Sequence, residues 1–95
     1  LDAHGAVAVD AQQRTSVAGI YAAGEPTGIG GVESALLQGE LAGASAAGDE
    51  RAARALARRV ARARRFGRAL ERAFALRTEL RAMPADDTIL CRCED

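Results

Sequence analysis

One stretch of this chain, residues 15–48, constrains the fold more than any other. Residues 20–23 are an apolar run of four, which is typical of a short strand covered on both faces. Glu25 follows directly after Gly24, then a glycine-rich turn at residues 26–31, and then a helical pattern of small and apolar side chains. This order predicts a site for a polyhydroxylated or anionic ligand, because helix-start amides and the helix dipole attract oxygen atoms that carry negative charge.

Two phosphate-binding motifs are excluded. Residues 28–31 begin like a dinucleotide-binding GxGxxG, but the third glycine would stand at position 33, which is Glu33. A P-loop requires a lysine, and every basic residue of this chain is arginine. On spacing alone, an ordinary strand–turn–helix whose glycines only shape the turn remains an alternative.

Residues 15–25, written T-x-x-x-G-I-Y-A-A-G-E, resemble the second FAD-binding motif of the two-dinucleotide-domain flavoprotein oxidoreductases. The continuation G-E-P-T-G-I-G-G and A-L-x-x-G-x-x-A-G is similar to the FAD-dependent amine and opine oxidase branch, which includes FAD subunits of opine oxidases, hydrogen cyanide synthase and heteromeric amino-acid dehydrogenases. The resemblance implies that Glu25, beside Gly24, holds a ribityl hydroxyl of FAD. It also implies that the amide of Val32, with that of Gly31, approaches O2 of the isoalloxazine ring.

The expected fold class is therefore α/β, the C-terminal part of a Rossmann-like FAD-binding domain followed by a long helical connector rich in arginine and alanine. Residues 1–48 are assigned to the FAD-binding domain, with a further strand at residues 6–9. Residues 49–84 are assigned to the connector, and residues 85–95 to the start of another module. Because the family implies several hundred residues, we expect this sequence of 95 to be a C-terminal piece that does not bind FAD tightly alone.

The connector is predicted as one helix from about Glu50 to Met83, capped by Asp49 and ended by Pro84. Its apolar residues are spaced by three and four, which places them in one stripe. The stripe contains Leu56, Val60, Ala63, Gly67, Leu70 and Phe74.

The connector also concentrates the positive charge of the chain. Of the 13 basic residues, all except Arg14 and Arg92 lie between residues 51 and 81, where only Glu71 and Glu79 oppose them. A basic stripe suggests nucleic acid, but no aromatic platform or base-reading motif accompanies it, so no nucleic-acid partner is predicted. The arginines are expected to face water or an acidic partner protein, while the apolar stripe packs on a neighbouring domain.

The last residues contain two cysteines, Cys91 and Cys93. Alone, a Cys-x-Cys pair is best interpreted as two free thiols. In this context, however, T-I-L-C-R-C-E-D at residues 88–95 resembles the start of a bacterioferritin-associated-ferredoxin-like (BFD-like) [2Fe-2S] domain. Such a cluster takes four thiolates, so the resemblance implies that Cys91 and Cys93 supply two of the four metal ligands in the parent protein.

The resemblance implies an enzyme that oxidises an amine, opine or amino acid by hydride transfer to FAD, with electrons passing to an iron–sulfur centre and with other subunits in a hetero-oligomer. No residue of this chain is predicted to be catalytic. Neither a transmembrane run nor a secretory signal is present, and the expected location is cytoplasmic. Two alternatives stay open, an NAD(P)H-dependent flavoprotein of the disulfide-reductase superfamily and a non-enzymatic helical interaction module.

Overall fold

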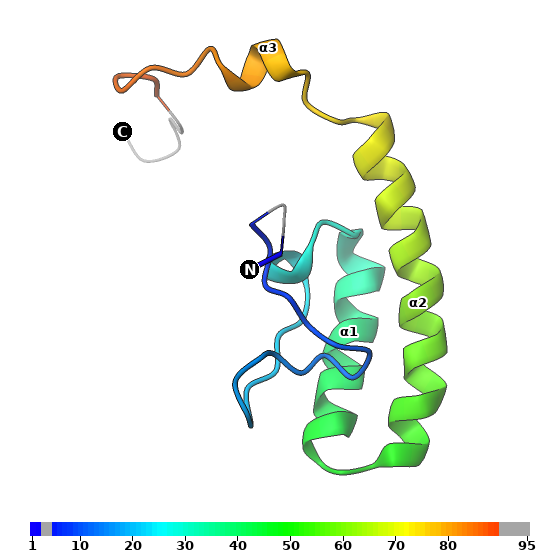
Figure 1. Ribbon diagram of the computed structural model, residues 1–95. Helices are drawn as coiled ribbons and strands as arrows, with labels where there is room; N and C mark the ends of the chain where they lie inside the picture. Colours follow the sequence, from blue (N-terminus) through cyan, green and yellow to red (C-terminus); the bar gives the residue numbers. More distant parts are fainter. Residues whose placement is uncertain (3–4, 90–95) are drawn as a thin grey trace.

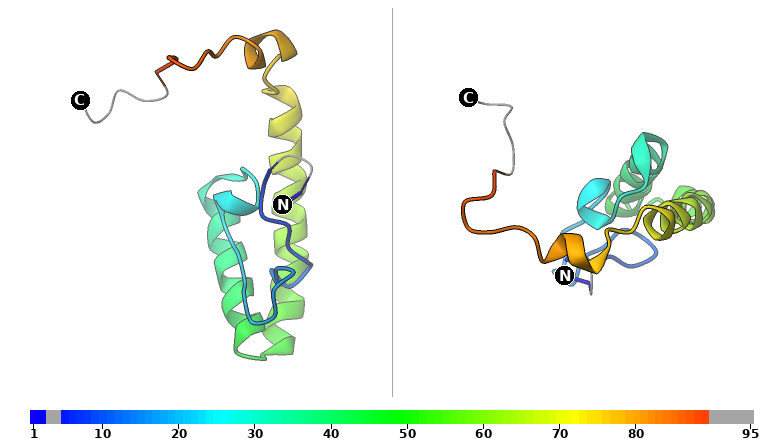
Figure 2. Two further views of the ribbon diagram at one scale, coloured as in Figure 1. Left: turned by 60° about the vertical axis from the view of Figure 1, so that its left-hand side comes forward. Right: turned by 90° about the horizontal axis from the view of Figure 1, so that it is seen from above.

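The computed structural model describes residues 1–2 and 5–89, and two antiparallel helices dominate it (Figure 1). Residues 5–30 run mostly as irregular chain along this helix pair, and residues 74–89 extend away from it (Figure 2). The dimensions are 49 × 26 × 26 Å. The elements are the 3-10 helix η1 (Glu25–Thr27), α1 (Gly31–Ala46), α2 (Glu50–Ala73) and α3 (Thr78–Arg81).

A tight turn reverses the chain between α1 and α2. Gly48 has a φ of 73°, the left-handed conformation that commonly ends helices and that glycine adopts without strain. The amide of Asp49 donates to the Ala44 carbonyl at 3.0 Å, and its carboxylate accepts from the Ala52 amide at 3.0 Å. Helix α1 thus begins at Gly31 and ends before Gly48, and the predicted Asp49 cap of α2 is confirmed. The predicted single helix to Met83 is wrong, because α2 ends at Ala73 and the separate α3 covers only Thr78–Arg81.

The core lies between α1 and α2. Leu41 is fully buried, and Ala53 and Val60 of α2 are almost fully buried against it. Leu37, Ala44, Leu56 and Ala57 surround this cluster. The N-terminal half of the apolar stripe of α2 thus packs on α1. Past Gly67 the stripe has no comparable cover within residues 5–89, since Leu70 and Phe74 are 38% and 82% exposed.

Gly67 marks a close approach of α2 to the chain that precedes α1. A Cβ atom at this position would lie 3.1 Å from the Ile29 carbonyl oxygen and 3.3 Å from Cα of Gly30. Gly67 is buried, and α2 continues through it without interruption. The absence of a side chain here lets the middle of α2 lie directly against the turn that leads into α1.

The expected α/β fold class is wrong for the part of the chain that the structure describes. Residues 1–2 and 5–89 contain no strand, and residues 6–9 and 20–23 are irregular, so these residues form no part of a Rossmann-like sheet. One isolated antiparallel bridge joins Arg14 to Tyr21. A strand requires a neighbour for its backbone hydrogen bonds. Within residues 5–89, the backbone of the second run is bonded only to the nearby residues 13, 15 and 17, and Ile20 is 53% exposed.

Candidate functional site

The four residues predicted to contact the cofactor come together in the structure. Gly24, Glu25, Gly31 and Val32 line one cavity of about 210 Å³, together with Ser34 and Gln38 of α1. The cavity lies where η1 and the glycine turn meet the first turn of α1. The sequence prediction that these residues share one site thus has a geometric basis, while their contact with a flavin remains a prediction.

The polar groups at this cavity are open to a ligand. Gly30 is the N-cap of α1, and no side chain caps that helix start. The Val32 side chain is 73% exposed. The Glu25 side chain is also exposed, and its carboxylate makes no recorded hydrogen bond or ion pair within residues 5–89. A carboxylate that accepts and helix-start amides that donate therefore border the same small space.

Gln38 holds the turn that carries Glu25. Its side chain is 3% exposed, and its Oε1 accepts a hydrogen bond from the Gly24 amide at 2.8 Å. The Thr27 hydroxyl lies 2.8 Å from the same oxygen and 2.8 Å from the Gly24 carbonyl. Nε2 of Gln38 donates to Oγ of Ser34, one turn earlier in α1, at 3.1 Å. One buried amide on α1 thereby links the cavity wall to both ends of the η1 turn.

A second buried glutamine, Gln13, connects this turn to α2. Gln13 is fully buried, and its Nε2 donates to the Ala22 carbonyl at 3.0 Å and lies 3.4 Å from Oε1 of Gln38. Arg64 of α2 donates to Oε1 of Gln13 at 2.8 Å. Burial and, to a lesser degree, the charge of Arg68 lower the pKa of Arg64. The side-chain amides of Gln13 and Gln38 thus join the η1 turn, α1 and α2.

The sequence patterns considered above did not identify Gln13, Ser34, Gln38 or Arg64. A usable pattern is present for two of them, because Ser34, Gln38 and the buried Leu41 follow one another by four and three residues on one face of α1. Polar residues at core spacing indicate a buried hydrogen-bond network.

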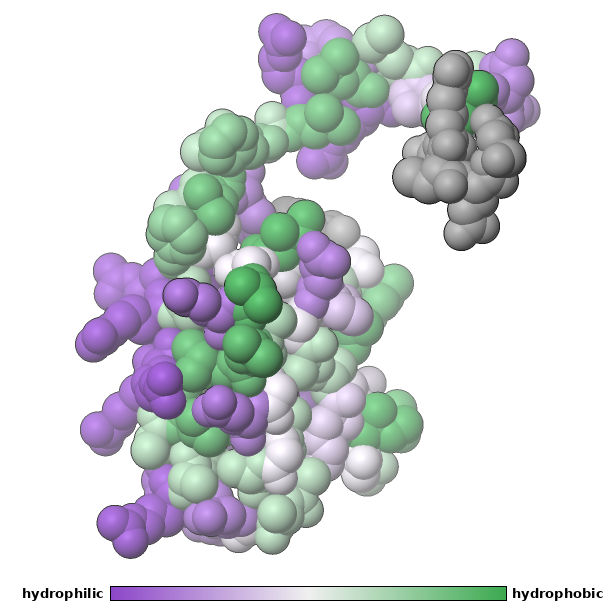
Figure 3. Space-filling view, turned by 180° about the vertical axis from the view of Figure 1, so that it is seen from behind, coloured by the Kyte–Doolittle hydropathy of each residue, from purple (hydrophilic) through white to green (hydrophobic). Residues whose placement is uncertain are grey.

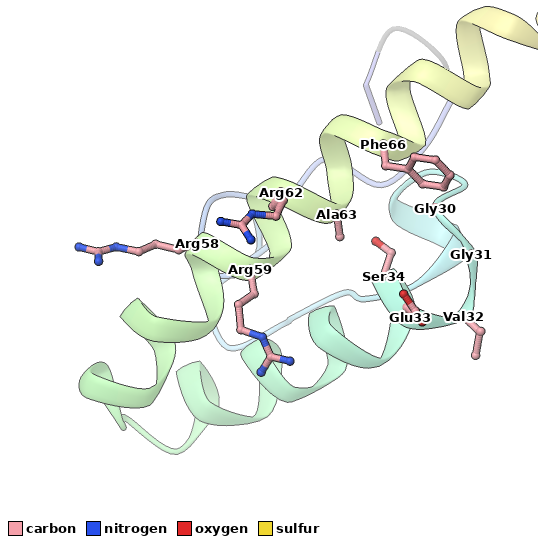
Figure 4. A pocket seen from close by; sticks show the side chains of 10 residues that line it. All are labelled: Gly30, Gly31, Val32, Glu33, Ser34, Arg58, Arg59, Arg62, Ala63 and Phe66. Carbon is pink, nitrogen blue, oxygen red and sulfur yellow. The ribbon is translucent and has the colours of Figure 1, made fainter.

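A larger groove opens beside this cavity, between the start of α1 and the middle of α2 (Figure 4). Its volume is about 670 Å³. Val32 and Glu33 of α1 and Arg58, Arg59, Arg62 and Phe66 of α2 line it. Below, these residues are called the arginine groove.

The chain is similar to an opine oxidase subunit from Agrobacterium tumefaciens (strain Ach5). The two are 39% identical over an alignment of 95 positions, which covers 90% of this chain. The resemblance to the opine oxidases that was inferred from residues 24–31 and 35–43 is confirmed. The chain spans about a fifth of the length of this relative, 19%. No protein-family model and no solved structure matches the chain.

The predicted metal ligands Cys91 and Cys93 lie outside the described residues. Within residues 1–2 and 5–89, no three His, Cys, Asp or Glu side chains are grouped so that they could hold a metal ion. In the same part of the chain, no helix combines the length and the apolar character that a membrane span requires.

Proposed function

We propose that this chain forms part of the flavin site of an FAD-dependent oxidoreductase that oxidises an amine, opine or amino acid. The observation that carries the proposal is the convergence of Gly24, Glu25, Gly31 and Val32 on one cavity. The similarity to the opine oxidase subunit of Agrobacterium supports the same class of reaction.

The residues present fit the middle of a flavin nucleotide. The Glu25 carboxylate is exposed and would accept hydrogen bonds from ribityl hydroxyls, which donate to oxygen. The amides of Gly31 and Val32, at a helix start that no side chain caps, would donate to O2 at the pyrimidine edge of the ring. When bound, FAD would accept the hydride removed from the substrate carbon next to nitrogen.

The buried glutamine network would keep these groups in position. The Gly24 amide is bonded to Gln38, so the backbone immediately before Glu25 is tied to α1, whose own first amides form the other side of the cavity. Donor and acceptor sides of the site are therefore fixed to one helix, which favours a preorganised site.

The remaining parts of the proposal extend beyond the described residues. We propose that Cys91 and Cys93 provide two thiolates to a [2Fe-2S] cluster that receives electrons from the flavin, and that the protein works in the cytoplasm. The name of the relative identifies it as one subunit of an enzyme, and we propose that this chain also belongs to a hetero-oligomer.

Substitution of Glu25 in the full-length protein tests the flavin site. Glu25→Ala should weaken FAD binding by about 1.5–3 kcal/mol, because it removes a charge-assisted hydrogen bond. Glu25→Gln keeps a hydrogen-bond acceptor without the charge, so its FAD affinity should lie between those of the wild type and of Glu25→Ala. The measurements are the flavin content of the purified protein and the FAD affinity of the apoprotein.

Glu40→Ala is the matched control, since Glu40 is an exposed carboxylate on the same helix α1 and does not line the cavity. It should bind FAD like the wild type. Equal FAD affinity in Glu25→Ala and Glu40→Ala would refute the proposed contact.

A further inference from the structure

We propose that the arginine groove docks an acidic segment of another polypeptide, one that carries an apolar side chain between or beside its carboxylates. The groove is separate in its chemistry from the proposed flavin cavity, although both share the start of α1. The inference does not depend on the identity of the cofactor.

The first argument is the uncompensated positive charge. Arg58, Arg59 and Arg62 lie within five residues of one helix and line the same groove. The ion pairs recorded among the described residues join Arg14 to Asp10 and Arg54 to Glu50, and none involves these three. Arginine forms bidentate contacts with carboxylates, so a partner segment bearing Asp or Glu complements this surface.

The second argument is the apolar end of the groove. Phe66 is 64% exposed and Val32 is 73% exposed, and both line the groove. In Figure 4 these two side chains lie toward the glycine turn, whereas Arg58 and Arg59 lie toward the opposite end. Figure 3 likewise shows hydrophilic side chains projecting along one edge of the molecule beside a hydrophobic patch. Exposed aromatic and arginine side chains in one concave surface are typical of protein–protein interfaces.

The third argument separates a polypeptide from a nucleic acid. Single-stranded nucleic acids are bound on successive aromatic platforms, and this groove offers only Phe66. Glu33 also lines the groove, near Val32, where it would repel a phosphate backbone that continued past the arginines. A polypeptide avoids this repulsion by placing its carboxylates against the arginines and an apolar side chain at the Phe66 end.

Charge reversal in the full-length protein tests this proposal. The probe is a short, fluorescently labelled helical peptide that carries glutamates and, toward one end of the same face, a leucine. Its binding is measured by anisotropy at physiological salt. A second peptide of the same charge carries serine in place of leucine, and an oligothymidine strand is the third probe. Arg58→Glu/Arg62→Glu should weaken binding of the leucine peptide by about tenfold or more. Arg58→Ala/Arg62→Ala should weaken it in the same direction, without introducing new negative charge.

Three further variants separate the possible explanations of a loss of binding. Arg51→Glu/Arg65→Glu changes the net charge equally on exposed positions of α2 that do not line the groove, and it should leave the leucine peptide within about twofold of the wild type. Phe66→Ser should weaken binding of the leucine peptide but not binding of the serine peptide. Glu25→Gln should leave peptide binding unchanged, so failure of the flavin proposal is distinguishable from failure of this one.

Three outcomes would overturn the proposal. The control pair could weaken the leucine peptide as much as the groove pair, which would show general attraction to a cationic helix. The serine peptide could bind as tightly as the leucine peptide, which would show that the apolar side chain does not contribute to binding. The oligothymidine could bind more tightly than either peptide in a manner sensitive to Arg58 and Arg62, which would assign the groove to nucleic acid.

Discussion

Replacing Gln38 by leucine is expected to loosen the turn that carries Glu25 while leaving the α1–α2 pair folded. Leucine is similar in length and apolar, so it fills the space of a side chain that is 3% exposed. It cannot accept the hydrogen bond that Oε1 of Gln38 receives from the Gly24 amide at 2.8 Å.

The structure sets the size of the effect. No other acceptor for the Gly24 amide is recorded within residues 5–89, so this donor loses its partner in a partly buried position. Two neighbouring hydrogen bonds do not involve Gln38 and should persist in the variant. They run from the Thr27 hydroxyl to the Gly24 carbonyl at 2.8 Å and from Nε2 of Gln13 to the Ala22 carbonyl at 3.0 Å. The substitution also removes the hydrogen bond from Nε2 of Gln38 to Oγ of Ser34 at 3.1 Å, and the unsatisfied Gly24 amide alone costs about 1–3 kcal/mol.

Hydrogen exchange of the full-length protein measures this loss locally. Amide protection of the peptide that spans residues 20–30 should fall in Gln38→Leu by the corresponding free energy. Gln38→Glu retains an acceptor at the same position and should preserve more of the protection. Gln12→Leu, at a glutamine whose side chain bonds the exposed Arg14, is the control and should change little. Unchanged protection in Gln38→Leu would refute the idea that this amide holds the turn.

Three further predictions test other parts of the structure. Gly67→Ala should destabilise the protein by about 1–3 kcal/mol in denaturant, since its Cβ would meet the Ile29 carbonyl at 3.1 Å, whereas Gly43→Ala, which meets nothing within 4 Å, should stabilise α1 by up to about 1 kcal/mol. Asp49→Ala should cost about 1 kcal/mol in the same assay through loss of the cap on α2. Slight burial opposes ionisation of Asp10, but hydrogen bonds from the Arg14 and Gln12 amides and the Arg14 guanidinium outweigh it and lower the pKa of Asp10 below 3.8. Because the pKa of Asp10 is depressed in the folded state, this stabilisation is present above pH 3.8 and is lost as the pH falls through the lowered value. In Asp10→Asn, the free energy of unfolding measured against pH should not show this loss.

The helix starts and the turn between α1 and α2 could be predicted from the sequence because they depend on neighbouring residues, whereas the helix predicted to run on to Met83 ends at Ala73, and α3 covers only Thr78–Arg81. Gly48 and Asp49 stand side by side, and the conformational freedom of one and the capping carboxylate of the other act within a single turn of chain. The strands could not be predicted in the same way. An apolar run such as residues 20–23 becomes a strand only when another segment pairs with it, and pairing is not encoded within the run.

In the hydrogen-bond network of Arg64, Gln13 and Gln38, the sequence pattern indicates one residue but not its partner. Arg64 stands four residues after Val60 and three before Gly67, on the same face of α2 as the apolar stripe, so its position alone indicates a cation that needs a partner. The partner is Gln13, 51 residues away, held at a φ of 64° that glutamine rarely adopts. Neither the distance in sequence nor that backbone conformation follows from the residue types. Since Gln13 and Gln38 then carry the contact from α2 to the turn before Glu25, the geometry of the proposed flavin site depends on the packing of α2 as well as on the motif that identified it.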